Sequence, residues 1–268
     1  MTGALASGAD ASGLVRLATA TLLVLVRVST VVAFAPFFSS KALPARSKAA
    51  FCAVLAWLLV PAVASSVRAN AVEITFTSVI GEVMTGAVYG LTLGLLQEVL
   101  LLAGQFVGMQ FSFSLVNLLD PASEIQTPLM GDLFSLLGTL TLLAAGLDRI
   151  LLASLVRSLR VVPPGGFHFT SMSVVSSTLV PLVAGCFLAA LELAAPVLAA
   201  TVLVEIAVGL VGKLSPQLPV IALTIPLKTL TGFALLIGSM ALWPRFVEAR
   251  FSSLLDIAER LMVVGGRG

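Results

Sequence analysis

Residues Ile74–Ala103 read ITFTSVIGEVMTGAVYGLTLGLLQEVLLLA, and this stretch decides the fold. It carries only two charged residues, Glu82 and Glu98. One helix that crosses a bilayer needs roughly 20 apolar residues, so this run is too long for a simple span. Two interpretations remain open at this point. Either the stretch is a helical hairpin, or the helices of the chain do not all cross the membrane.

Further apolar runs lie on both sides of this stretch. They are Leu14–Phe38, Ala49–Val67, Leu129–Leu147, Val174–Ala200, Thr201–Val211 and Leu218–Trp243. The pattern predicts an all-α integral membrane protein built of helical hairpins. It has six to seven hydrophobic helices, with re-entrant or broken segments. We expect one membrane-embedded domain over residues 1–268, with residues 245–268 as a polar C-terminal tail that forms a short surface helix.

Composition supports a membrane protein and excludes several other classes. Hydrophobic residues make up 59% of the 268 residues and charged residues 10%, against about 25% charged residues in soluble domains. The net charge of +2 offers no basic surface for nucleic acid. A single histidine, His168, and two distant cysteines, Cys52 and Cys186, exclude a multi-histidine metal site and a disulfide framework. We therefore expect no enzyme, no metal and no cofactor.

The distribution of basic residues conflicts with a simple count of membrane crossings. Lys41, Arg46 and Lys48 favour a cytoplasmic position for one connection, and the arginines of Arg149–Arg160 favour the same for another. One crossing per apolar run would place these two stretches on opposite sides. The conflict indicates that the chain is not an ordinary membrane bundle.

Small residues recur at helical spacing. Gly86, Gly90 and Gly94 are four positions apart, and Gly104 and Gly108 repeat the spacing. Residues i and i+4 share one face of a helix, so the glycines predict a smooth stripe for close helix packing. The partner is either another helix of this chain or another subunit.

Six ionisable residues lie inside apolar segments. Each is costly against lipid and is expected to face protein or water. They form either a proton or ion relay, or pairs that hold helices or partner chains together. Their scatter over four segments favours pairing. They are Arg27, Glu82, Glu98, Glu192, Glu205 and Lys228.

The apolar pattern is interrupted twice. The stretch Gly104–Pro128 is half polar and ends in Asp-Pro and Thr-Pro, which predicts an irregular loop. At membrane depth such a loop needs protein or a water-filled cavity beside it, and its apolar side chains could close that cavity. The alternative is an ordinary surface loop. The second interruption is Ser215–Pro219 with Pro226, which predicts a turn followed by a kinked or broken helix.

Several stretches resemble the FliR family of flagellar export-gate membrane proteins. In Ala103–Pro121 the matching positions are Gly104, Gly108, Met109, Gln110, Leu118, Asp120 and Pro121. Further similar stretches are Arg27–Ser29 with Phe34–Phe38, Ser158–Arg160 with Pro163, and Leu210–Gly232. Gln105 and Ser112 depart from the family pattern, which usually has Glu and Gly there. The motifs occur in the family's order and cover almost the whole chain.

This resemblance implies a subunit of the flagellar type III export gate, in the bacterial inner membrane at the flagellar basal body. The expected partners are FliP-like and FliQ-like membrane proteins, an FlhB-like protein, membrane lipid and unfolded exported subunits. The alternatives are the equivalent injectisome subunit, which tends to have Asn-Pro where this chain has Asp120-Pro121, and a small secondary transporter.

The resemblance also implies two sets of site residues. A gate loop that helps to plug the channel comprises Gly104, Gly108, Met109, Gln110, Phe111, Ser112, Phe113, Asn117, Asp120 and Pro121. Together with the glycine spacing and the charges in apolar segments, the resemblance gives the helix-packing or interface residues, which are Gly86, Gly90, Gly94, Arg27, Glu82, Glu205, Pro216, Gln217, Pro226 and Lys228.

Overall fold

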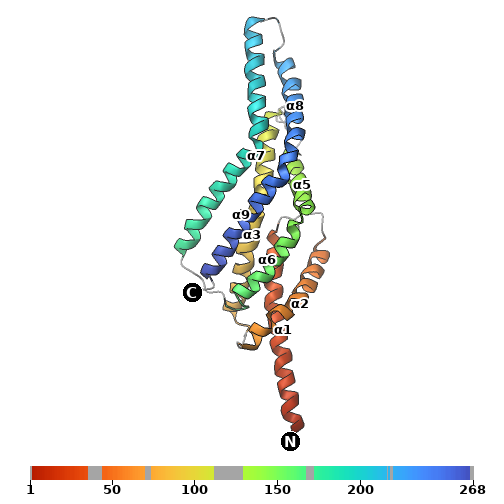
Figure 1. The fold of residues 1–268 in the computed structure, drawn as a ribbon, viewed down its shortest axis with the longest axis vertical. Helices are drawn as coiled ribbons and strands as arrows, with labels where there is room; N and C mark the ends of the chain where they lie inside the picture. Colours follow the sequence, from red (N-terminus) through yellow and green to blue (C-terminus); the bar gives the residue numbers. More distant parts are fainter. Residues whose placement is uncertain are drawn as a thin grey trace, which may run out of the picture. The chain divides into compact units, whose positions relative to one another are not determined.

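A computed structural model describes residues 2–35, 44–69, 74–111, 129–166, 172–215, 217 and 220–265. These residues are helical almost throughout and contain no strand, so the prediction of an all-α protein is confirmed. The elements are α1 (Thr2–Phe34), α2 (Ala45–Ala69), α3 (Phe76–Gln110), α5 (Leu129–Ala144), α6 (Leu147–Val161), α7 (Met172–Leu214), α8 (Val220–Ser239), η1 (Met240–Leu242) and α9 (Trp243–Gly265) (Figure 1).

Four described helical stretches are long and apolar enough to cross a membrane. They are Val15–Phe34, Phe76–Gln110, Val180–Leu214 and Ala222–Val263. α5 and α6 qualify only together, as one bent pair. The break between them is at Gly146, whose φ of 69° is a left-handed conformation that glycine adopts without a steric penalty. The expectation of hydrophobic helices with a broken segment is confirmed.

The chain separates into two compact units. Unit 1 comprises Met1–Gly94, Gly146–Leu179 and Phe251–Gly268. Unit 2 comprises Leu95–Ala145 and Val180–Arg250. The long helices α3, α7 and α9 therefore each contribute residues to both units. The expectation of a single domain over the whole chain stays a prediction.

Unit 1 is built on two amphipathic helix faces. α1 packs along α2, and α2 also contacts α6. Leu23, Val24, Val28 and Val31 of α1 are buried, at the spacing of one helix face. α6 likewise buries four leucines at intervals of four residues, Leu147, Leu151, Leu155 and Leu159. Burial of these faces draws both helices into unit 1.

Unit 2 has an apolar core formed by α3, α5, α7, α8 and the start of α9. Phe134 and Trp243 lie with ring centroids 4.9 Å apart in this core. α7 ends at Leu214, Gln217 lies in a turn and α8 begins at Val220, so the predicted turn within Ser215–Pro219 is confirmed. Figure 1 shows α7 bending partway along its length, and Pro181 and Pro196 inside it supply the usual cause of such a bend.

Several predicted boundaries are wrong. Ile74–Ala103 is no hairpin, because α3 continues unbroken to Gln110. The predicted helices Val174–Ala200 and Thr201–Val211 are one helix, α7, since no turn residue separates them. The predicted run Leu129–Leu147 breaks at Gly146.

Two charged stretches, one predicted as a connection and the other as a short surface helix, belong to amphipathic helices. Arg149–Arg160 lies within α6 and forms part of its amphipathic surface. The tail from Arg245 belongs to the 23-residue helix α9, which buries Val247, Phe251 and Ala258.

Candidate functional site

A buried ion pair joins α1 to α3 in unit 1. The Nε of Arg27 lies 2.6 Å from Oε2 of Glu82, and Nη2 donates to Oε1 at 3.0 Å. Both side chains are fully buried. This two-point geometry is the strong form of an arginine–carboxylate contact. It matches the expectation that ionisable residues in apolar segments pair with one another.

The same pair fixes the chain that follows α6. Nη1 of Arg27 donates to the Val162 carbonyl at 2.9 Å. The Gly165 amide donates to Oε1 of Glu82 at 2.8 Å. Gly165 has a φ of 79°, a conformation that L side chains rarely adopt. Two charges thus satisfy each other and two backbone groups, which tie three parts of unit 1 together.

The glycine stripe lets α3 approach α1 closely. A Cβ atom on Gly86 would lie 2.7 Å from both the Arg27 carbonyl and the Thr30 Cβ. On Gly90 it would lie 2.8 Å from the Phe34 Cβ, and on Gly94 2.9 Å from the Phe34 carbonyl. All three contacts are within this chain. Of the two possible partners for the stripe, the structure therefore shows a helix of the same chain.

A second polar cluster joins three helices in unit 2. Lys228 of α8 is 6% exposed and forms an ion pair with Glu205 of α7. Its Nζ also donates to Oε1 of Gln110, at the end of α3, over 3.2 Å. The Glu205 side chain is 49% exposed, so this pair is much more open to its surroundings than Arg27–Glu82. We call Gln110, Glu205 and Lys228 the α3–α8 junction.

Aromatic packing beside this junction fixes the residue that follows α3. Phe111 is 3% exposed and contacts Gly232 of α8. Its ring centroid lies 4.9 Å from that of Phe233. Gly232 is one helical turn beyond Lys228, so polar and apolar contacts to α3 come from the same face of α8. Phe111 belongs to the core of unit 2.

The other predicted gate residues differ from the expected loop. Gly104, Gly108, Met109 and Gln110 lie in the last turns of α3, because the apolar helix continues past the predicted interruption. Gly108 packs on Met130 of α5, as does Gly104. Met109 is 62% exposed. The remaining gate residues lie outside the described residues: Ser112, Phe113, Asn117, Asp120 and Pro121.

The last predicted packing residues surround the turn between α7 and α8. Gln217 is exposed, and Pro226 lies exposed inside α8. Pro216 lies outside the described residues. Glu192 pairs with Arg250, while Glu98 is exposed.

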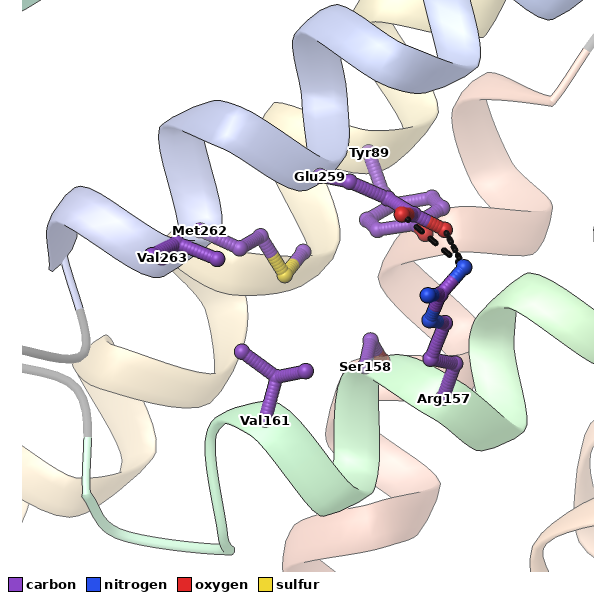
Figure 2. A pocket seen from close by; sticks show the side chains of 7 residues that line it. All are labelled: Tyr89, Arg157, Ser158, Val161, Glu259, Met262 and Val263. Atoms are coloured by element: carbon purple, nitrogen blue, oxygen red, sulfur yellow. Dashed lines mark hydrogen bonds and ion pairs between the residues drawn. The ribbon is translucent and has the colours of Figure 1, made fainter.

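Sequence reasoning missed two polar features. In unit 1 the Tyr89 hydroxyl donates to the Ser154 carbonyl at 3.3 Å. Beside Tyr89, Arg157 and Glu259 form an ion pair (Figure 2). In unit 2 the Gln97 amide bonds to Ser135 of α5. A helical-wheel comparison of α6 would have found Arg157 opposite the leucines. No local pattern indicates its partner, 102 positions away.

The polar contacts of the candidate site hold helices together. Within the described ranges, no group of three or more His, Cys, Asp or Glu side chains could hold a metal ion. The polar contacts of the candidate site are ion pairs and hydrogen bonds between helices. They satisfy polar groups that water would otherwise hydrate. Fold and site together define a helical membrane protein in which charged residues of apolar segments pair and fasten helices to one another.

Comparison with known proteins identifies the family. Residues 18–254 match the family described as bacterial export proteins, family 1. The chain belongs to this family. It is 29% identical to flagellar biosynthetic protein FliR of Caulobacter vibrioides over 242 residues, covering 88% of this chain and 94% of that protein.

Two further relatives carry the same name. The protein of Escherichia coli is 27% identical over 87% of this chain and 88% of its own length. That of Bacillus subtilis is 26% identical over 95% of this chain and 99% of its own length. The resemblance to the FliR family is thereby confirmed.

Proposed function

We propose that this chain is a membrane subunit of the flagellar type III protein export gate. It joins FliP-like and FliQ-like proteins to form the pore for unfolded flagellar subunits, and an FlhB-like protein is a further partner. It acts in the bacterial inner membrane at the flagellar basal body, as a structural component of the channel. The names of the relatives favour the flagellar system over the injectisome.

The α3–α8 junction is the observation that carries this proposal. Lys228 and Gly232 hold Gln110 and Phe111, which lie in the middle of the family motif Ala103–Pro121. The helix end from which the motif continues is therefore anchored by both a charge and an aromatic ring. In this proposal the residues that follow Phe111 help to close the channel, and Phe111 serves as their anchor.

The ion pairs do not favour a secondary transporter. Arg27 and Glu82 satisfy each other within unit 1, and Glu205 and Lys228 pair within unit 2. A transporter site needs charges that exchange their partners for a substrate or ion. The fully buried pair has no such vacancy, because two backbone groups complete its hydrogen bonding.

Assembly is tested by purification of the tagged chain from its native host in mild detergent, followed by native mass determination. The expected result is a complex with several copies of two smaller hydrophobic proteins. A monomer or homodimer, from a host that makes those partners, would contradict the proposal.

Closure is tested by ion conductance of cells that make the assembled gate. Phe113→Ala is expected to raise leakage through the closed channel. Phe111→Ala is the poorer probe, because loss of a buried phenylalanine destabilises a core by about 3–5 kcal/mol. Leu230→Ala, at a side chain that is 71% exposed on α8, is the matched control. Unchanged conductance in Phe113→Ala would remove the closing role and leave assembly untouched.

A further inference from the structure

A small cleft lies between α6 and α9 in unit 1, with Tyr89 of α3 beside it (Figure 2). Its volume is about 120 Å³. Val161, Met262 and Val263 form an apolar side. Arg157, Ser158 and Glu259 line it together with the tyrosine. A cleft with an apolar wall and charged groups at its edge suits an amphiphilic ligand better than a purely polar one.

The exposed face of α6 is basic. Arg149, Arg157 and Arg160 are all exposed. Arg149 and Arg160 are about three helical turns apart, and Arg157 is one turn from Arg160, so all three share one side of the helix. The four buried leucines occupy the opposite side. The leucines pack inside unit 1, so the arginines form the face of α6 that can contact an anionic headgroup.

The ion pair at the cleft leaves arginine donors for a ligand. Arg157 is 69% exposed, and only its Nη1 contacts Glu259, at 3.3 Å from Oε2. This contact neutralises the charge of Glu259, and the other N–H groups of the Arg157 guanidinium do not contact Glu259. On α9, Asp256 and Arg260 have opposite charges and contribute no net charge to the neighbourhood. The positive charge that remains belongs to α6.

Both walls of the cleft come from residues at the ends of candidate membrane-spanning stretches. Val161 is the last residue of α6, which closes the bent α5–α6 pair. Val263 is the last residue of the candidate span Ala222–Val263. The ends of spans meet the headgroup layer of a bilayer, where arginine side chains reach the interface. The cleft therefore combines an exposed arginine with an apolar wall.

We propose that this cleft binds an anionic phospholipid. The lipid phosphate contacts Arg157 and Arg160, and the adjoining part of an acyl chain lies against Val161, Met262 and Val263. This binding does not depend on the proposed export function. It would fasten the end of α9 to α6 in the membrane.

Lipid binding is tested on the purified full-length chain by native mass spectrometry. The chain is titrated with phosphatidylglycerol and with phosphatidylcholine that carries the same acyl chains. The wild type is expected to prefer phosphatidylglycerol. The double variant R157Q/R160Q is expected to lose about 10- to 30-fold of its phosphatidylglycerol affinity, since a basic residue near an anionic surface contributes about 1 kcal/mol. The matched control K213Q/R245Q removes two exposed charges from unit 2 and is expected to keep the affinity.

Three results would overturn the proposal. They are equal binding of both lipids, equal loss in the control variant, and full competition by inorganic phosphate, which lacks the acyl chains. If the double variant is poorly folded by size-exclusion chromatography, R160Q alone replaces it, because this variant keeps the Arg157–Glu259 pair. Unchanged affinity in a well-folded R160Q would then remove Arg160 from the site and refute the stated geometry.

Discussion

Replacement of Glu82 by methionine is the sharpest test of the buried pair in unit 1. Glu82→Met leaves the Arg27 guanidinium fully buried without its carboxylate. Loss of one partner of a buried ion pair destabilises a protein by about 3–5 kcal/mol. For a chain of this size each kcal/mol lowers Tm by roughly 2–4 °C, so the expected decrease is about 10 °C. The assay is thermal unfolding in detergent, followed by fluorescence-detected size-exclusion chromatography.

The double variant Arg27→Met/Glu82→Met separates an ion pair from mere loss of packing. It removes both charges and leaves only the Val162 carbonyl and the Gly165 amide without their partners, at about 1 kcal/mol each. We therefore expect the double variant to be more stable than Glu82→Met. Glu259→Gln, which breaks the partly exposed pair with Arg157, is the control and is expected to change stability by less than about 1 kcal/mol. A double variant whose loss of stability equals the sum of the losses in Glu82→Met and Arg27→Met would refute the reasoning.

Three further substitutions test the close contacts. Gly86→Ala is expected to lower the free energy of unfolding by about 1–3 kcal/mol, because the new Cβ would lie 2.7 Å from atoms of α1. Gly185→Ala is the control: a Cβ there meets nothing within 4 Å, so this variant is expected to raise Tm slightly. Gly232→Ala is expected to displace Phe111 and lower Tm, with Gly238→Ala as the open-space control; equal Tm values would mean that Phe111 does not depend on this glycine. Lys228→Met is expected to cost about 1–2 kcal/mol, less than Glu82→Met, because the half-exposed Glu205 can be rehydrated; a larger loss than in Glu82→Met would contradict this order.

Hydrophobic runs predicted the type of element well and its boundaries poorly. The run Ile74–Ala103 identified α3, but polar residues after Ala103 suggested a loop where the helix continues to Gln110. Helix ends depend on tertiary packing as well as on local preference, and Gly104 and Gly108 lie against α5. A single sequence does not distinguish a glycine that allows close helix packing from a glycine that belongs to a loop.

The pairing of charges could be anticipated only in part. A charged side chain that faces lipid is energetically costly, so charges in apolar segments are predicted to have partners. These charges are Arg27, Glu82, Glu205 and Lys228. The identity of each partner depends on which helices are neighbours, and the sequence contains no direct signal for that. Glu205 and Lys228 are separated by a turn, so a hairpin could have suggested their contact. Arg27 and Glu82 are 55 positions apart, with α2 between them in sequence.

The ion pairs Arg27–Glu82 and Lys228–Glu205 differ in the free energy needed to separate their charges. Opening Arg27–Glu82 exposes two fully desolvated charges to an apolar interior, which is expensive in any state of the protein. Opening Lys228–Glu205 frees a carboxylate that is already half exposed, and only Lys228 must find a new partner. Gln110 is a neutral partner already at 3.2 Å, so the lysine keeps a hydrogen bond when the carboxylate leaves. Separation of Glu205 from Lys228 at the α3–α8 junction is therefore expected to cost less free energy than separation of Arg27 from Glu82 in unit 1.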